Sequence, residues 1–184
     1  MFDGYKKVFW GMLLTMFHLN LGAIQILPNF IAILIICSGI KKILVCYDNT
    51  SIRISLQLFQ ITVAISFITF VLTFLGIESR FDNIILNIIC FNIGSILEIM
   101  SIVKLLEGTS EVLSDNYSNC VGDKYKNIAI YYTYFYSVVL IASNINYIFM
   151  GKSITLIIAI YAMIIKILIV FSFRKLYEGN LQIS

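Results

Sequence analysis

The chain has very little charge. Asp, Glu, Lys and Arg together make up 12% of its 184 residues, whereas 60% of the residues are hydrophobic. A water-soluble domain of this size needs far more charged surface, so the composition excludes one. The uncharged stretches approach or exceed the roughly 20 residues that span a hydrocarbon core. We therefore expect an all-α, polytopic membrane helix bundle that forms a single domain over residues 1–184, in contact with the lipid bilayer.

Residues that carry catalytic or metal chemistry are scarce as well. His18 is the only histidine, so no multi-histidine metal site can form, and a serine–histidine pair would need this one residue. All the aspartates lie outside the long apolar stretches, which excludes an aspartyl dyad within a membrane. The basic residues other than Lys166 stand at the ends of apolar stretches and form no patch for nucleic acid. We expect no enzymatic activity, no metal, no cofactor and no nucleic-acid partner.

The single proline divides the longest apolar stretch. No residue between Lys7 and Lys41 is charged. One straight helix over that stretch would be about 50 Å long, well beyond one bilayer crossing. Asn20 and Gly22 are residue types that end helices, and Pro28 suits the first turn of a new helix. The chain is therefore predicted to turn back between Asn20 and Pro28, after a first helix that is short or partly re-entrant.

With this turn, the chain is predicted to form six transmembrane helices. Their approximate bounds are 5–19, 28–46, 54–75, 84–106, 128–150 and 153–174. Lysine and arginine collect on the cytoplasmic side of membrane proteins and so indicate the topology. Of the thirteen lysine and arginine residues, six crossings place ten on the side of both termini and two on the opposite side, and Lys166 lies inside a helix. We therefore expect a multi-pass protein of the cell membrane, with both termini in the cytoplasm.

The segment FWGMLLTMFHLNLGAIQILPNFIAILIICSGIKKI, which begins at Phe9, resembles a known pattern. It is similar to the N-terminus of a group of small, uncharacterised six-helix membrane proteins of Gram-positive bacteria. Their signature is an FWG start, a DILPDFIGY-like turn and a glycine-containing second helix. Here Gln25, Pro28 and Asn29 belong to the turn, and the two acidic positions are the amides Gln25 and Asn29. The resemblance covers about the first quarter of the chain and implies a fold but no activity.

Polar residues within the predicted helices recur at helical spacing. In lipid, such stripes mark the faces on which helices approach one another, although a substrate path would need the same residue types. The candidates are Asn87, Ser95 and Ser101 in the fourth helix, Gln57 and Gln60 in the third, and Asn144 in the fifth. The run YYTYFY at 131–136 is typical of an aromatic belt at the membrane surface.

Two charged residues lie inside predicted helices. Glu98 precedes Lys104 by six residues, or about 9 Å, and Lys166 precedes Arg174 by eight residues, or about 12 Å. The two charges therefore lie at similar depth. An isolated charge near the bilayer centre costs about 2.5–3.5 kcal/mol, so each has reason to find the other. We predict an ion pair between them. A structural role is favoured over a role as a proton or cation site. The alternative is that Lys166 reaches the cytoplasmic surface.

Two classes of function remain open. The first is a non-enzymatic regulator, immunity factor or assembly subunit that acts through partners, with a possible protein-docking site in the charged cytoplasmic segment 104–127. The second is a small-solute transport component, because the length and topology resemble the substrate-binding subunits of energy-coupling-factor transporters. Those subunits carry an Ala-xxx-Ala face on the first helix, whereas Val8–Leu19 contains no alanine. The sequence therefore favours the first class.

Overall fold

The computed structural model describes residues 2–16, 20–21, 24–25, 29–75, 84–149 and 152–178. Helices account for nearly all of these residues. The elements in chain order are α1 (Phe2–Met16), β1 (Asn20–Leu21), β2 (Ile24–Gln25), α2 (Asn29–Cys46), α3 (Thr50–Phe74), α4 (Ile84–Asn116), α5 (Asn119–Phe149) and α6 (Lys152–Tyr177).

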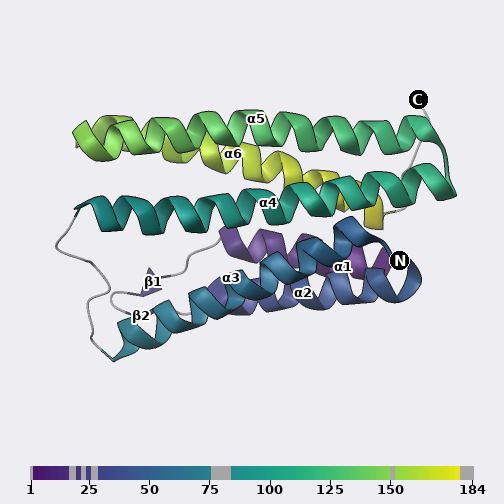
Figure 1. Cartoon of the computed structure of the whole chain (residues 1–184), viewed down its shortest axis with the longest axis horizontal. Coiled ribbons are helices and arrows are strands. Elements are labelled where there is room, and N and C mark those ends of the chain that lie inside the picture. Colours follow the sequence, from purple (N-terminus) through teal and green to yellow (C-terminus); the bar gives the residue numbers. More distant parts are fainter. Residues whose placement is uncertain are drawn as a thin grey trace.

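The six helices close into a ring. Each helix packs against the next one in the chain, and α6 packs against α1. In Figure 1, α4, α5 and α6 form one layer and α1, α2 and α3 the other. We call the end where α1 begins and α6 finishes the terminal end, and the end that carries β1 and β2 the hairpin end. The two layers diverge toward the hairpin end (Figure 1).

The buried core lies at the terminal end. Tyr5, Leu105, Leu106, Phe173 and Leu176 are fully buried there. The rings of Tyr5 and Phe173 stack with their centroids 6.2 Å apart, which joins the first helix to the last. Aromatic pairs of this kind stabilise a core beyond the area that they bury. The terminal end is thus closed by large side chains from α1, α4 and α6.

The α1–α2 contact depends on small residues. A Cβ atom added to Gly39 in α2 would lie 2.7 Å from the Gly4 carbonyl oxygen and 2.9 Å from the Val8 backbone nitrogen. One added to Gly11 would lie 3.0 Å from the Ala32 carbonyl oxygen. Small residues let helix backbones approach closely where no hydrophobic effect drives association in lipid. These glycines therefore set the distance between the two helices.

Among the described residues, five helices are long and apolar enough to cross a membrane. They are α2 to α6, and α1 with its 15 residues is not among them. The structure therefore shows the helical, membrane-type bundle that the composition predicts.

At the terminal end, the middle helices extend beyond the predicted crossings. α3 begins at Thr50, α4 continues to Asn116, and α5 begins already at Asn119. The segment 104–127 is therefore almost wholly helical and contains no long loop. The reason is packing: Leu113 is fully buried, and the Ser110 hydroxyl donates to the Gly122 carbonyl oxygen at 2.7 Å, which joins α4 to α5.

The predicted turn after α1 contains a short β-hairpin. Asn20 pairs with Gln25 and Leu21 with Ile24, in antiparallel register. This pairing satisfies backbone N–H and C=O groups that a bare turn would leave without partners. Pro28 lies outside the described residues, and α2 begins at the next residue, Asn29.

Candidate functional site

Glu98 and Lys166 form an ion pair across the interior of the helix ring. The Lys166 Nζ atom lies 2.6 Å from the Glu98 Oε1 atom. No Cα atoms of α4 and α6 lie within 8 Å of each other over the described parts of these helices. The two side chains therefore bridge a space that the helix backbones leave open. α4 supplies the carboxylate and α6 supplies the ammonium group.

Tyr136 in α5 completes this site. Its hydroxyl donates to the second carboxylate oxygen of Glu98, Oε2, at 3.4 Å. The ammonium group of Lys166 lies 5.8 Å from the centroid of the Tyr136 ring, close enough for a cation–π attraction. One aromatic residue thus contacts both members of the pair. Three helices fix the positions of the two charges, which we call the Glu98–Lys166 site.

Two cavities meet at the Glu98–Lys166 site. The first, of about 370 Å³, reaches α2 and α3, and we call it the α2–α3 cavity. The second, of about 500 Å³, lies along α5 and α6, and we call it the α5–α6 cavity. Glu98, Lys166 and Ser95 line both. Volumes of this size accommodate small organic molecules.

The walls of both cavities mix apolar and hydrogen-bonding side chains. Among the described residues, Glu98 and Lys166 are the only charged groups that line them. Thr62 and Ser66 of α3 add hydroxyls to the α2–α3 cavity. The polar groups of the α5–α6 cavity include Tyr136, Ser143, Asn146 and Thr155. This donor and acceptor set can recognise a polar molecule.

The site lies at the floor of these cavities. Asn29, at the hairpin end of α2, lines the α2–α3 cavity, and Asn146 and Thr155 line the α5–α6 cavity toward the same end. On the terminal side of the site, Tyr132 and Ile169 are at most 5% exposed. Lys166 and Glu98 keep 27% and 32% of their side-chain surface accessible, and both cavities border this surface. Among the described residues, the lining of both cavities thus extends from the site toward the hairpin end, and buried side chains lie on its terminal side.

The predicted polar stripe divides between cavity and helix contacts. Ser95 lines both cavities. Ser101 is buried, and its carbonyl oxygen accepts a hydrogen bond from the Ser55 hydroxyl at 2.7 Å, which joins α4 to α3. Asn144 exchanges two hydrogen bonds with Asn92, at 2.8 and 2.9 Å, and so joins α5 to α4. These contacts hold the walls of the site in place.

The interpretation of Gln57 and Gln60 as interior residues was wrong. Both side chains are exposed and line neither cavity. The reason is the rotation of α3, which turns Ser55 and Phe59 toward its neighbours and leaves the two amides outside. The side chains of Asn87 and Gln25 lie outside the described part of the structure, as does Pro28, while Asn29 is exposed and borders the α2–α3 cavity.

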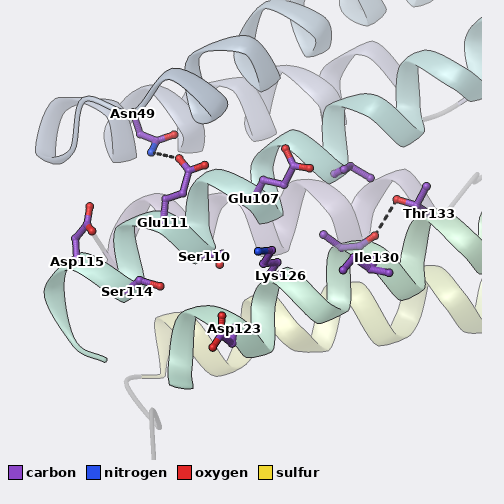
Figure 2. Close-up of a pocket in the computed structure, with 12 residues that line it drawn as sticks. Asn49, Glu107, Ser110, Glu111, Ser114, Asp115, Asp123, Lys126, Ile130 and Thr133 are labelled. Atoms are coloured by element: carbon purple, nitrogen blue, oxygen red, sulfur yellow. Dashed lines mark hydrogen bonds between the residues drawn. The ribbon is translucent and has the colours of Figure 1, made fainter. Parts of the chain in front are cut away.

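A second concave surface lies at the terminal end. This groove between α4 and α5, with a volume of about 590 Å³, is shown in Figure 2. Glu107, Glu111 and Asp115 line it at four-residue spacing along α4, and Asp123 and Lys126 line it from α5. Two of the carboxylates have partners: Glu107 pairs with Lys104, and Glu111 accepts a hydrogen bond from Asn49, each at 2.7 Å. We call this surface the acidic groove.

Two important residues did not emerge from the sequence. Tyr136 was assigned with its neighbours to an aromatic belt, which fits the exposed Tyr131 and Tyr134 but not the buried Tyr132 and Tyr136. The four-residue spacing of this buried pair was the available signal, because such residues share one helix face. Asn92 was missed although it is an amide within an apolar helix, which alone predicts a partner.

Comparisons with models of protein families, with curated proteins and with solved structures give no match for this chain. Among the described residues, no group of three or more histidine, cysteine or acidic side chains could hold a metal ion. The Glu98–Lys166 site and its cavities are therefore the features that bear on function.

Proposed function

We propose that the chain is a multi-pass protein of the cell membrane that crosses it six times, with α1 as a short first crossing and both termini in the cytoplasm. The distribution of charge supports this topology. Lys7, Lys42, Arg53, Lys126 and Arg174 all belong to the terminal end of the bundle, as the positive-inside rule requires of a cytoplasmic face. The resemblance of the N-terminal segment to a six-helix group agrees with this topology.

Reporter fusions test the topology. A reporter fused after Gly22 should be external, and one fused after Lys42 should be internal. An internal signal at Gly22 would remove the first crossing, and with it the six-crossing arrangement.

Within this topology, we propose that the protein acts without catalysis by binding a small polar solute in the cavities above the Glu98–Lys166 site. One observation carries the proposal: the ion pair forms the floor of two open cavities instead of being packed in side chains. Charged groups inside a membrane are expensive, and by default they indicate a pathway or binding site. In this topology the cavities open to the outside, as expected of a solute-binding or transport component.

Native mass spectrometry of the purified chain, released from mild detergent, tests this function. A co-purified small molecule should be present, and Ser95→Phe should eliminate it by filling the space where the two cavities meet. Ile157→Phe is the matched control, because Ile157 is 66% exposed and lines neither cavity. The absence of any bound solute from the wild-type protein, in membranes as well as in detergent, would contradict the proposal.

The acidic groove favours a second function, the docking of a basic segment of a cytoplasmic protein. Its four carboxylates stand out from a cytoplasmic face that is otherwise rich in lysine and arginine. Such a contact would make the chain a regulator, an immunity factor or an assembly subunit. A photo-crosslinking residue at Asp115 should capture a specific protein, whereas one at the lipid-facing Ile157 should not. Equal capture at both positions would argue against docking.

A further inference from the structure

The charge balance of the cavities limits which solutes they can take. We infer that the ligand carries no net charge, so that it is either a neutral polar molecule or a zwitterion, with a branched apolar body. This inference rests on the proposed solute-binding function and adds the chemical class of the ligand. It follows from the charged groups that line the cavities and from the way in which they are paired.

The charges already present in the cavities balance each other. The Glu98 carboxylate and the Lys166 ammonium group are 2.6 Å apart and neutralise each other. No other charged side chain lines either cavity among the described residues. A solute with a net charge would therefore enter a low-dielectric space that holds no free counterion. Burial of an uncompensated charge is strongly unfavourable, whereas a dipolar molecule adds none.

The ion pair keeps part of its hydrogen-bonding capacity. An ammonium group has three N–H donors, and a carboxylate offers about four acceptor positions. In the described contacts, Lys166 uses one donor on Glu98 and a second on Tyr136, which leaves one ammonium donor, and Glu98 accepts from Lys166 and Tyr136. One ligand can therefore accept a hydrogen bond from Lys166 and donate one to Glu98, while the ion pair stays intact. An amide group, or the ammonium and carboxylate groups of a zwitterion, has this combination.

The rest of the wall of both cavities is largely apolar. Apolar, mostly branched side chains cover much of both cavities, among them Ile33, Ile36, Phe59, Val139 and Ile158. They would contact a compact apolar body better than an extended polar one, since a buried hydroxyl of the ligand would need its own partner. The ligand class is therefore a molecule with one polar, net-neutral end and one branched apolar end.

A series of similar shape tests the charge rule. Leucine is the zwitterion, 4-methylpentanamide the neutral member, 3-methylbutylamine the cation and 4-methylpentanoate the anion. We would measure the shift of the thermal unfolding midpoint of the full chain in lipid nanodiscs at neutral pH. For the wild-type protein we expect the zwitterion or the amide to bind at least about tenfold more tightly than the amine and the acid.

Single charge removals should change this preference in opposite directions. Glu98→Gln leaves Lys166 without its counterion, so the variant should prefer the acid. Lys166→Gln leaves Glu98 without its counterion, so that variant should prefer the amine. The double variant with both glutamines keeps the cavities neutral and should still bind the amide. It also controls for any loss of folding that an unpaired charge causes in the single variants.

The outcomes separate this inference from the proposed function. Wild-type protein that binds the amine or the acid as tightly as the amide overturns the charge rule and leaves solute binding in place. The same holds if the co-purified solute of the native mass spectra proves to carry a net charge, or if both single variants keep the wild-type preference. If neither the spectra nor the series reveals any ligand, the proposed function fails, and the charge rule fails with it.

Discussion

The Glu98–Lys166 ion pair makes a quantitative prediction through a double-mutant cycle. Breaking a fully buried pair by removing one partner costs about 3–5 kcal/mol, because it leaves a charge without compensation. Here 27% and 32% of the two side chains remain accessible to the cavities, so water would solvate part of the remaining charge. We therefore expect Glu98→Gln and Lys166→Gln each to lower the free energy of unfolding by about 2–3 kcal/mol.

The double variant with both glutamines should lose no more than either single variant. This corresponds to a coupling energy of at least about 2–3 kcal/mol, against the roughly 0.3–0.5 kcal/mol by which independent sites deviate from additivity. The exchange Glu98→Lys with Lys166→Glu should restore part of the loss, because Tyr136 contacts both positions and its hydroxyl can donate to a carboxylate at either. The assay is equilibrium unfolding in mixed micelles with a denaturing detergent.

The pair Lys104–Glu107, which lies within one helix, gives a matched control. Its atoms are as close, at 2.7 Å, but its side chains are 36% and 37% accessible and one helical turn apart on α4. Glu107→Gln should therefore change the free energy of unfolding by at most about 0.5 kcal/mol. Strictly additive losses at Glu98 and Lys166, or a control as costly as the central pair, would refute the assignment of a coupled interior site.

Three further predictions follow from side-chain contacts. Gly39→Ala should destabilise the bundle by more than about 1 kcal/mol, because its Cβ atom would meet the α1 backbone, whereas Gly94→Ala, which meets nothing within 4 Å, should be neutral or slightly stabilising in the same unfolding assay. Asn144→Leu should cost about 1 kcal/mol by leaving the Asn92 amide without its interhelical partner, and Asn92→Leu with Asn144→Leu should recover part of that loss. Tyr132→Phe should preserve or raise the unfolding midpoint, because its buried hydroxyl has no partner among the described residues, whereas Tyr125→Phe should lower it by removing the hydrogen bond to the Ser172 carbonyl oxygen.

The sequence predicts those features that depend on one residue in an apolar setting. Glu98 and Lys166 are the clearest case, since a charge inside a lipid-spanning helix needs a partner and the two lie at similar depth. The division of the first apolar stretch near Pro28 is another. In both cases the sequence alone disfavours the alternative. An unpaired charge in lipid is costly, and a single helix of about 50 Å is too long for one bilayer crossing.

Features that depend on how helices rotate and diverge could not be predicted in this way. Gln57 and Gln60 share a polar face with the same spacing as an interior stripe, but the packing of Phe59 turns that face outward. The start of α5 at Asn119 depends on its contact with α4, where the Ser110 hydroxyl donates to the Gly122 carbonyl oxygen, and the sequence of α5 alone does not reveal that contact. The cavities are a property of the whole ring, and no single helix encodes them.

The length of α1 explains why the ion pair lies where it does. At about 1.5 Å per residue, α1 is about 22 Å long and α4 about 50 Å long. α1 meets α6 through Tyr5 with Phe173 and through Phe9 with Tyr177, both near the terminal end. Its last turn supplies only Met12 and Thr15 to the α2–α3 cavity.

Toward the hairpin end, the described helices that continue are therefore α2 to α6, and their layers diverge (Figure 1). The Glu98–Lys166 site lies near the level at which α1 ends, since Met12, Thr15 and Met16 border the small space of about 20 Å³ beside both charges. On the terminal side six helices exclude solvent, and on the other side five leave room for a ligand. A short first helix thus has a functional consequence: it places two charges that could not remain unpaired in lipid at the boundary between a closed core and an open cavity.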